Sequence, residues 1–353
     1  MAKRVAGGNG AGKSKGHVLV TGGAGYIGCV LTELLLERGY RVTVLDRLFF
    51  GDTLKHLQGN RNLRVVRDDV RWVPASIFKG VDAVFDLAAL SNDPAGDLDP
   101  KRTLEINHQG RARIARLAKK AGVSRYVLAS SCSIYGFQEA VVDERSPIHP
   151  LTTYAEANGL AEKSNLALAG ERFTSTALRQ ATVYGLSKRM RFDLAINGMT
   201  LALFKEGLVK VMRDGTQWRP MVHIRDTSRA FIRVLESEPG KVNGEIFNVG
   251  SEEQNLQVLP LARRLSEALG IPFKEAWYGD PDHRSYRVSF RKIRERIGYA
   301  TEATPEDGAR EIFAALKSGA TTDGPATRTV EWYKSLIAYQ GILENVVIRH
   351  RVL

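Results

Sequence analysis

Short apolar runs alternate with longer segments of helical periodicity over the first 185 residues. The runs at 17–20 and 41–46 are apolar and β-branched, as in buried parallel strands. Between them, residues 26–40 carry apolar side chains at the spacing of a helix. Further strand-like runs lie at 63–70, 81–90, 125–136 and 174–185, with helix-like segments near 104–121 and 154–169. This alternation predicts an α/β fold, a doubly wound parallel sheet of Rossmann type with helices on both faces.

After residue 185 the pattern is looser. Short strand-like runs at 218–226 and 244–250 mix with helix-like segments at 259–270 and 308–319. We therefore predict a second, smaller α/β lobe that holds a substrate. The expected division is a flexible basic tail at 1–16, a dinucleotide-binding domain at 17–185 plus about 223–250, and a substrate lobe at 186–222 plus 251–353.

Two glycine-rich patterns compete near the start of the chain. Residues Gly7–Ser14 fit the spacing of a nucleotide-hydrolase P-loop. That loop works only between a strand and a helix, because the helix N-terminus binds the phosphate. Only six residues, MAKRVA, precede Gly7, too few and too polar for a buried strand, and a strand-like run follows Ser14. Since both flanks are missing, we interpret this match as coincidental.

The second glycine pattern has both flanks. Gly22, Gly25 and Gly28 follow a predicted strand and open a predicted helix, with Tyr26 and Ile27 inside the turn. Asp46 ends the next strand about twenty residues later, where a carboxylate accepts the adenosine ribose hydroxyls. This complete unit predicts a dinucleotide site. Asp46 favours NAD because it repels a 2′-phosphate, although the adjacent Arg47 leaves NADP open.

Composition narrows the classes of function. Fifty-one Lys and Arg against 39 Asp and Glu give a net charge of +12, but the charges are interleaved and no nucleic-acid-binding module accompanies them. The excess suits an enzyme of anionic substrates equally well. Cys29 and Cys132 are far apart in the sequence, which fits a reducing cytoplasm. No apolar stretch approaches the length of a membrane span, and the first residues lack the apolar centre of a secretory signal.

Several motifs resemble one known family. They are TGGAGYIG from Thr21, DLAAL from Asp86, SSCSIYG from Ser130, Tyr154 in PLTTYAEAN, LRQATVYG from Leu178 and RPMVHIRD from Arg219. In this order they are similar to the extended short-chain dehydrogenase/reductases of the NAD-dependent epimerase/dehydratase group, in style closest to UDP-glucose 4-epimerases. The resemblance implies NAD as cofactor, a nucleotide-diphosphate sugar in the second lobe, no metal, and a homodimer.

The resemblance also implies a catalytic set with one departure. Ser131 and Tyr154 match the serine and the tyrosine base, but Asn158 stands where the family has a lysine. Lys163 lies nine positions from Tyr154, on the opposite face of the predicted helix. Three explanations are open: a substitution introduced to trap substrate, a different cation near the tyrosine, or a protein that binds its ligands without efficient turnover.

Other site residues carry over by position. Those expected along the cofactor are Asp69 and Val70 at the adenine, with Leu87, Ala88, Ala89 and Asn107 in the wall. Arg219 matches an arginine that binds the diphosphate, and Asn197 and Arg284 are further candidates for that task. His223 and Asp226 are expected to be structural, and Asp86 stands where the family often has histidine.

The reaction subtype follows from the motif around Tyr135. Dehydrating and decarboxylating members carry an acid two places before this tyrosine, where this chain has Ser133. Cys132 is out of register for a catalytic cysteine, so we expect it to pack. We therefore predict a 4-epimerase. The alternatives are a ketoreductase or dehydratase of the same family, an NAD and nucleotide-sugar binding protein impaired by Asn158, and, more remotely, a nucleic-acid binder that uses the basic tail.

Overall fold

A computed structural model describes residues 14–280 and 284–347 of the chain. The P-loop match at Gly7–Ser14 and the predicted basic tail at 1–16 therefore lie almost entirely outside the described residues. At the start of the described part, the carbonyl of Gly16 accepts a hydrogen bond from the backbone N–H of Arg41, which places residue 16 at the head of the first strand.

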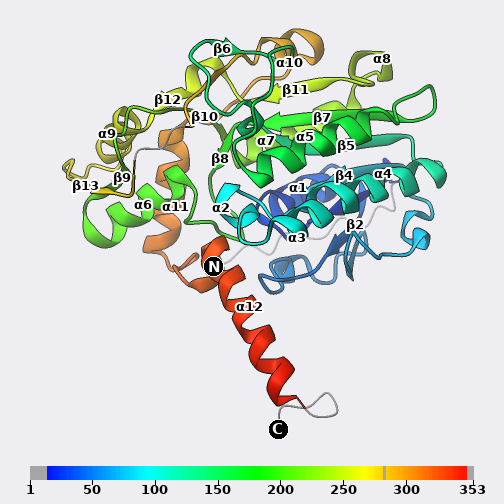
Figure 1. Cartoon of the computed structure of the whole chain (residues 1–353), viewed down its shortest axis with the longest axis horizontal. Coiled ribbons are helices and arrows are strands. Elements are labelled where there is room, and N and C mark those ends of the chain that lie inside the picture. Colours follow the sequence, from blue (N-terminus) through cyan, green and yellow to red (C-terminus); the bar gives the residue numbers. More distant parts are fainter. Residues whose placement is uncertain (1–13, 281–283, 348–353) are drawn as a thin grey trace, which may run out of the picture.

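A seven-stranded sheet forms the centre of the molecule, in the order β11-β7-β5-β4-β1-β2-β3 (Figure 1). Its strands are all parallel: β1 (His17–Thr21), β2 (Arg41–Asp46), β3 (Leu63–Arg67), β4 (Ala83–Asp86), β5 (Arg125–Ser131), β7 (Thr174–Gln180) and β11 (Ile246–Val249). This confirms the predicted Rossmann-type fold. The strand order reverses between β1 and β4, and ligands of such sheets bind in the crevice at that point.

The centre of the sheet is buried on both faces, because strands such as β1 and β4 are apolar at successive positions. Val18 and Val20 belong to a core that includes residues of α1 (Tyr26–Glu37) and α7 (Ile224–Glu236). Leu19, pointing the other way, belongs to a second core with residues of α4 (Arg111–Lys120) and α5 (Thr153–Leu166). Strands buried on both sides are typical of doubly wound sheets.

The helix predicted near 104–121 is interrupted. It consists of α3 (Pro100–Leu104), a π-helical turn η3 (Glu105–Gly110) and α4. A π turn inserts an extra residue into the helical repeat, so it changes which side chains face the sheet, and such turns are frequent at functional sites. Directly after η3, Arg111 lies fully buried.

The remaining elements form smaller units beside the sheet. A three-stranded sheet contains β8 (Thr182–Tyr184), β10 (Trp218–His223) and β12 (Asn255–Gln257). A third core lies among α6 (Ala195–Glu206), α9 (Val258–Ala268) and α11 (Pro305–Lys317). Two strand pairs join β9 (Val209–Met212) to β13 (Glu275–Tyr278) and β6 (Val141–Val142) to β14 (Arg287–Val288). The other helices are α2 (Asp93–Gly96), α8 (Pro239–Val242) and α10 (Arg291–Ile297), with 3-10 turns at Lys55–Leu57, Ala75–Phe78, Cys132–Tyr135, Glu252–Gln254 and Pro325–Thr327.

Helix α12 (Thr329–Val346) projects from the body of the molecule (Figure 1). Its first turns contact the loop after β2, since Trp332 Nε1 donates to the carbonyl of Phe49 at 2.6 Å and Tyr333 packs on the rings of Phe49 and Phe50. The sequence predicts that this segment belongs to the substrate lobe, and its first turns contact residues of both predicted units, Phe49 and Arg189. Within residues 14–280 and 284–347, no helix combines the length and the apolar character needed to span a membrane.

Candidate active site

One cavity runs along the carboxyl ends of the sheet strands, from the loop after β2 to the second lobe. The predicted site residues that line it are Gly22, Gly25, Tyr26, Ile27, Gly28, Asp46, Arg47, Asp69, Val70, Leu87, Ala88, Ala89, Ser131, Tyr154, Asn158, Arg219 and Arg284. These residues come from segments scattered over most of the chain, and the fold brings them to one edge of the sheet. Two predicted residues, Asn107 and Asn197, do not line the cavity.

Asn107 fixes a loop behind the cavity. Its side chain is fully buried and bridges one residue, accepting from the backbone N–H of Leu90 at 2.8 Å and donating to the carbonyl of Leu90 at 3.0 Å. The amide therefore holds the loop that follows β4, whose residues Leu87–Leu90 do line the cavity. Its action on a ligand is through that loop rather than by contact.

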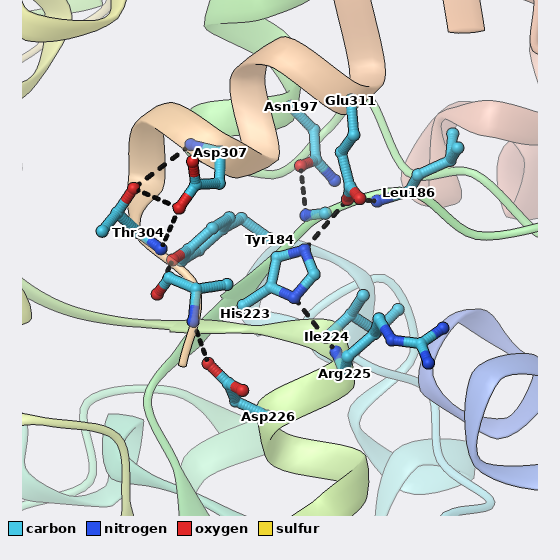
Figure 2. A network of polar contacts seen from close by, with 12 residues as sticks. Tyr184, Leu186, Asn197, His223, Ile224, Arg225, Asp226, Thr304, Asp307 and Glu311 are labelled. Atoms are coloured by element: carbon cyan, nitrogen blue, oxygen red, sulfur yellow. Dashed lines mark hydrogen bonds and ion pairs between the residues drawn. The ribbon is translucent and has the colours of Figure 1, made fainter. Parts of the chain in front are cut away.

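Asn197 belongs to a separate polar network (Figure 2). Its Oδ1 accepts from the backbone N–H of Gly185 at 3.0 Å, while its Nδ2 donates to the hydroxyl of Tyr26 at 2.9 Å. It therefore anchors Tyr26, at the start of α1, instead of meeting a diphosphate. The sequence shows an asparagine at position 197, but it does not show that the side chain is buried away from the cavity.

The same network contains His223 and Asp226. His223 Nε2 lies 2.9 Å from the carboxylate of Glu311 on α11, and that carboxylate accepts from the backbone N–H of Leu186 (Figure 2). Asp226 accepts from the backbone N–H of Ala303. These bonds tie β10 and α7 to α11, and none of these side chains lines the cavity. The geometry agrees with the structural role expected for both residues.

The glycine loop leaves room for a dinucleotide. Gly22 has φ +69°, and a Cβ there would lie 2.9 Å from the backbone N of Ala88. A Cβ on Gly28 would lie 2.2 Å from the carbonyl oxygen of Gly22, so α1 could not approach the loop as closely. Bare backbone is thus presented at the N-terminus of α1, where N–H groups and the helix dipole attract a diphosphate. The residues present fit a dinucleotide cofactor.

Carboxylates line the end of the cavity beside β2 and β3, where the sequence predicts the adenosine of the cofactor (the adenosine end). Asp46 accepts from the backbone N–H groups of Ala24 at 3.0 Å and Leu48 at 2.8 Å, which hold it at the end of β2. Burial raises the pKa of Asp46, and these hydrogen bonds counteract that rise. Arg47 donates to Asp69 at 2.7 Å. The guanidinium of Arg47, the residue after Asp46, is therefore already engaged by a carboxylate.

Asp69 is held ionised by its neighbours. Burial alone would raise its pKa, but hydrogen bonds from Arg71 and from Arg47 outweigh burial and lower the pKa to about 2. Arg71 approaches the carboxylate at 2.9 Å. The carboxylate also accepts from the backbone N–H of Arg71, which fixes the turn after β3. This turn brings Asp69 and Val70 to the adenosine end of the cavity.

Sequence reasoning missed a buried cation, Arg189. Its guanidinium stacks on Phe50 at 3.6 Å, donates to Thr329 Oγ1 at 2.9 Å and lines the cavity. Among the described residues no carboxylate lies within ion-pair distance of it, and burial lowers its pKa to about 10. A buried arginine without a carboxylate suits a phosphate ligand. The basic run KRMR after a predicted strand was the signal available in the sequence.

The catalytic candidates meet at the centre of the cavity. Ser131 ends β5, and its Oγ accepts from the backbone N–H of Ser133 at 3.1 Å. Tyr154 lies in the first turn of α5, which Thr152 caps by accepting from the N–H of Ala155. Burial raises the pKa of Tyr154, while hydrogen bonds with Asn158 and Ser131 and the charge of Arg111 lower it.

The neighbours of Ser131 are engaged elsewhere. Ser130 donates to Glu162 at 2.5 Å, and Glu162 forms a buried ion pair with Arg179 at 2.7 Å. Cys132 is fully buried, donates to the carbonyl of Arg179 and has a pKa raised by burial, as expected for a packing residue. Among the described residues no cluster of three or more His, Cys, Asp or Glu forms a metal site.

Asn158 occupies the place where the resemblance expects a lysine. It is buried, and its Nδ2 donates to the carbonyl of Tyr154 at 3.1 Å. Its Oδ1 accepts at 3.1 Å from Arg111 of α4. Lys163, by contrast, is exposed to solvent on the far side of α5, as its spacing predicted.

At the other end of the cavity lie two arginines from the second lobe. Arg284 forms an ion pair with Asp93, at the start of α2. Arg219 lies over the ring of Tyr286, 5.8 Å from its centroid, and donates to the carbonyl of Arg284. Their guanidinium groups give this end of the cavity the fork-shaped donors that recognise phosphates.

The chain is similar to known proteins of one family. Residues 18–250 match the family model described as NAD dependent epimerase/dehydratase family. UDP-glucuronic acid decarboxylase 2 of Arabidopsis thaliana is 28% identical over 342 residues, covering 90% of this chain and 74% of that protein. UDP-glucuronic acid decarboxylase 1 of Xenopus tropicalis is 26% identical over 314 residues, covering 85% and 72%.

Solved structures show the same likeness. MoeE5 in complex with UDP-glucuronic acid and NAD superposes with a TM-score of 0.77 at 28% identity, covering 86% of this chain and 100% of that one. UDP-glucose 4-epimerase of Thermotoga maritima with UDP-glucose gives 0.76 at 25% identity, with 86% and 100% covered. Both likenesses cover 86% of this chain.

Proposed function

Because the chain belongs to the NAD-dependent epimerase/dehydratase family, we propose that it is an enzyme that oxidises and re-reduces carbon 4 of a nucleotide-diphosphate sugar, and thereby acts as a 4-epimerase. Its cofactor is NAD. The glycine loop and Asp46 would hold the adenosine half, and Arg189 would compensate the charge of the diphosphate. The sugar nucleotide would occupy the end lined by Arg219 and Arg284.

The chemistry of the proposal rests on Tyr154. As tyrosinate it removes the proton of the sugar 4-hydroxyl, and Ser131 donates a hydrogen bond to the same oxygen. Bound beside Tyr154, NAD would supply the acceptor and the donor of the hydride at carbon 4. Tyr154 then gives its proton back to the new hydroxyl. For the product to be the epimer, the intermediate ketone must present its opposite face before the hydride returns.

One observation carries the choice of epimerisation over elimination. Ser133 lines the cavity at the place where dehydrating and decarboxylating relatives have an acid, and its Oγ is buried without a hydrogen-bond partner in the structure. A hydroxyl can donate a hydrogen bond to a sugar but is a poor acid or base at neutral pH. The nearby carboxylates Asp93 and Asp193 are each paired with an arginine, which lowers the pKa of Asp193 despite its burial.

The proposed substrate is a UDP-sugar, either UDP-glucuronic acid or UDP-glucose. Both are named in relatives: MoeE5 was solved with each of them, and the decarboxylases are named for UDP-glucuronic acid. Decarboxylation of UDP-glucuronic acid is the second candidate, because relatives covering most of this chain carry that name. Ser133 argues against decarboxylation, because the family resemblance implies an acid at this position in decarboxylating members. A protein that binds NAD and the sugar nucleotide with little turnover is the third.

The test is a product analysis by mass spectrometry and NMR. Purified protein is incubated with UDP-glucuronic acid or UDP-glucose, with and without added NAD. Epimerisation leaves the mass unchanged and moves the signal of the sugar C4 proton. Loss of carbon dioxide from UDP-glucuronic acid would establish decarboxylation instead. Firm binding of both ligands with neither product would favour the binding protein.

Location and assembly belong to the same proposal. A cytoplasmic location is supported by Cys29 and Cys132, which are both buried and unpaired with each other. The homodimer expected from the resemblance remains a prediction, and sedimentation of the purified protein tests it.

A further inference from the structure

Arg111 is a buried cation at the back of the candidate active site. Its side chain is 1% exposed and borders the cavity beside Asn158. It is the first residue of α4, directly after the π-helical turn η3. Arg111 itself belongs to none of the motifs from which the catalytic set was predicted.

The guanidinium is anchored on three sides. Nη2 donates to the carbonyl oxygens of Asp86 at 2.9 Å and Ala129 at 2.5 Å, at the ends of β4 and β5. Nε approaches the carboxylate of Asp86 at 3.4 Å. That carboxylate also accepts from Thr21 Oγ1 at 2.6 Å and from the hydroxyl of Tyr126. Asp86 is thereby satisfied, and it holds Arg111 rigidly.

The remaining nitrogen of Arg111 contacts Asn158, the residue that stands where the family has a lysine. Nη1 donates to Oδ1 of Asn158 at 3.1 Å. Because an arginine only donates, the oxygen of the amide must face it, and Nδ2 must face Tyr154, to whose carbonyl it donates at 3.1 Å. The amide is thus held in one of its two orientations by a residue from another helix.

We infer that Arg111 is a positioning residue that replaces the absent lysine in two respects: it fixes Asn158 toward Tyr154, and it supplies a positive charge beside this base. The inference rests on the proposed function, in which Tyr154 is the base. It explains how a chain with asparagine at position 158 retains a competent site, because the charge enters from α4 instead of from α5.

Other charged groups also surround Tyr154. Asp93 of α2 opposes its ionisation and is paired with Arg284. Arg191 is near Tyr154 and is paired with Asp193. Since Arg111 is itself paired with Asp86, its influence on Tyr154 depends on that carboxylate. Removing the charge of Asp86 alone, and removing the charges of both Asp86 and Arg111, should therefore shift the pKa of Tyr154 in opposite directions.

The experiment measures the ionisation of Tyr154 in the NAD-loaded protein. Ultraviolet absorbance of tyrosinate is titrated in each variant, and the same titration in a matching Tyr154→Phe variant is subtracted. Asp86→Asn unmasks the charge of Arg111 and should lower the pKa of Tyr154 by about one unit. Arg111→Met combined with Asp86→Asn removes the charge without leaving a buried carboxylate unpaired, and should raise this pKa by about one unit.

A rescue and a control complete the design. Adding Asn158→Lys to the Arg111→Met and Asp86→Asn variant should bring the pKa of Tyr154 back down. Arg179→Met with Glu162→Gln removes another buried ion pair, one partner of which lies on α5. This double change should leave the pKa of Tyr154 unchanged. Circular dichroism and NAD binding show whether each variant is folded.

The outcome that overturns the inference is a titration of Tyr154 at the same pH in the parent, Asp86→Asn and Arg111→Met/Asp86→Asn. Arg111 would then serve packing alone. A shift of equal sign in both variants would also contradict it. These readouts need no turnover, so a failure to find an epimerisable sugar would count against the proposed function without deciding the role of Arg111.

Discussion

Arg47 and Asp69, which follow neighbouring strands, form an ion pair of 2.7 Å at the adenosine end of the cavity. The pair answers a question left open by the sequence, where Arg47 next to Asp46 made NADP a competing cofactor. With its guanidinium engaged by Asp69, Arg47 has little charge to offer a 2′-phosphate, while Asp46 remains to repel one.

NAD selectivity should therefore depend on Asp46. Asp46→Ser removes the carboxylate that we propose accepts the ribose hydroxyls, so NAD affinity should fall about tenfold, in the range of a lost charged hydrogen bond. NADP affinity should fall less, or rise. Calorimetric titration of nucleotide-free protein with each cofactor measures both. The nucleotide released from the denatured parent protein should be NAD, and release of NADP would contradict this assignment.

Arg219 should bind the sugar nucleotide and not NAD. Arg219→Ala should weaken UDP-sugar binding by about 2 kcal/mol, as for losing a charge-assisted hydrogen bond, and leave NAD affinity intact. Arg287 is a matched control: it stacks on Trp218 at 5.4 Å but does not line the cavity. Arg287→Ala should leave both affinities unchanged. Equal UDP-sugar binding by Arg219→Ala and the parent would remove Arg219 from the site.

Turnover should rise with pH because it needs ionised Tyr154. Burial raises the pKa of this tyrosine, so only a small fraction is ionised at neutral pH, and the rate should still be climbing on the alkaline side of neutrality. Tyr154→Phe should lower kcat at least a hundredfold, the usual share of a general base. Initial rates across pH, with a stability check at each pH, test this. A rate that is flat through neutral pH would show a base that is already ionised.

Alkaline pH should destabilise the fold. Burial raises the pKa of Cys29 from its ordinary 9.0 to about 12, and burial together with Asp86 raises the pKa of Tyr126 well above 10.0. A folded pKa above the unfolded one contributes stability that is complete below the unfolded pKa and is lost as pH rises through the folded pKa. The free energy of unfolding should thus be level below about pH 9 and then fall, by up to about 1.4 kcal/mol per pH unit for each such group.

Urea unfolding between pH 8 and pH 11 measures this fall. Tyr126→Phe removes one contributor, so its free energy of unfolding should decline less steeply above pH 10 than that of the parent. An unfolding free energy that stays level to pH 11 in the parent would contradict the burial of these groups.

Local sequence signals predicted the sheet and much of the cavity. The glycine loop is readable because strand, turn and helix occupy adjacent residues, and the acid at 46 follows at a fixed spacing. Ser131 and Tyr154 were found by their motifs, and the structure brings both to the cavity. Their catalytic role remains a proposal.

Features that depend on contacts between distant segments were not predictable. Asn197 looked like a binding residue, but its partners, Gly185 and Tyr26, are set by how α6 packs. The π turn before Arg111 leaves no periodicity signal, because one extra residue shifts the apolar pattern only slightly. Arg189 is covered by Phe50 and Thr329, which are far from it in the sequence, so its burial could not be inferred from the residues around it.

Helix α12 gives the cofactor site an unusual dependence on the rest of the chain. Trp332 is hydrogen-bonded to Phe49, a residue 283 positions earlier, and Tyr333 completes the wall beside it. Much of α12 beyond Tyr333 is exposed to solvent, so the contacts of its first turns, including that of Thr329 with Arg189, hold the helix on the body of the molecule. Detachment of α12 would open the adenosine end while the seven-stranded sheet stayed intact. The rate at which the cofactor leaves would then be set by the fraying of one helix, and a protease that trims this helix would convert a tight holoenzyme into one that exchanges NAD freely.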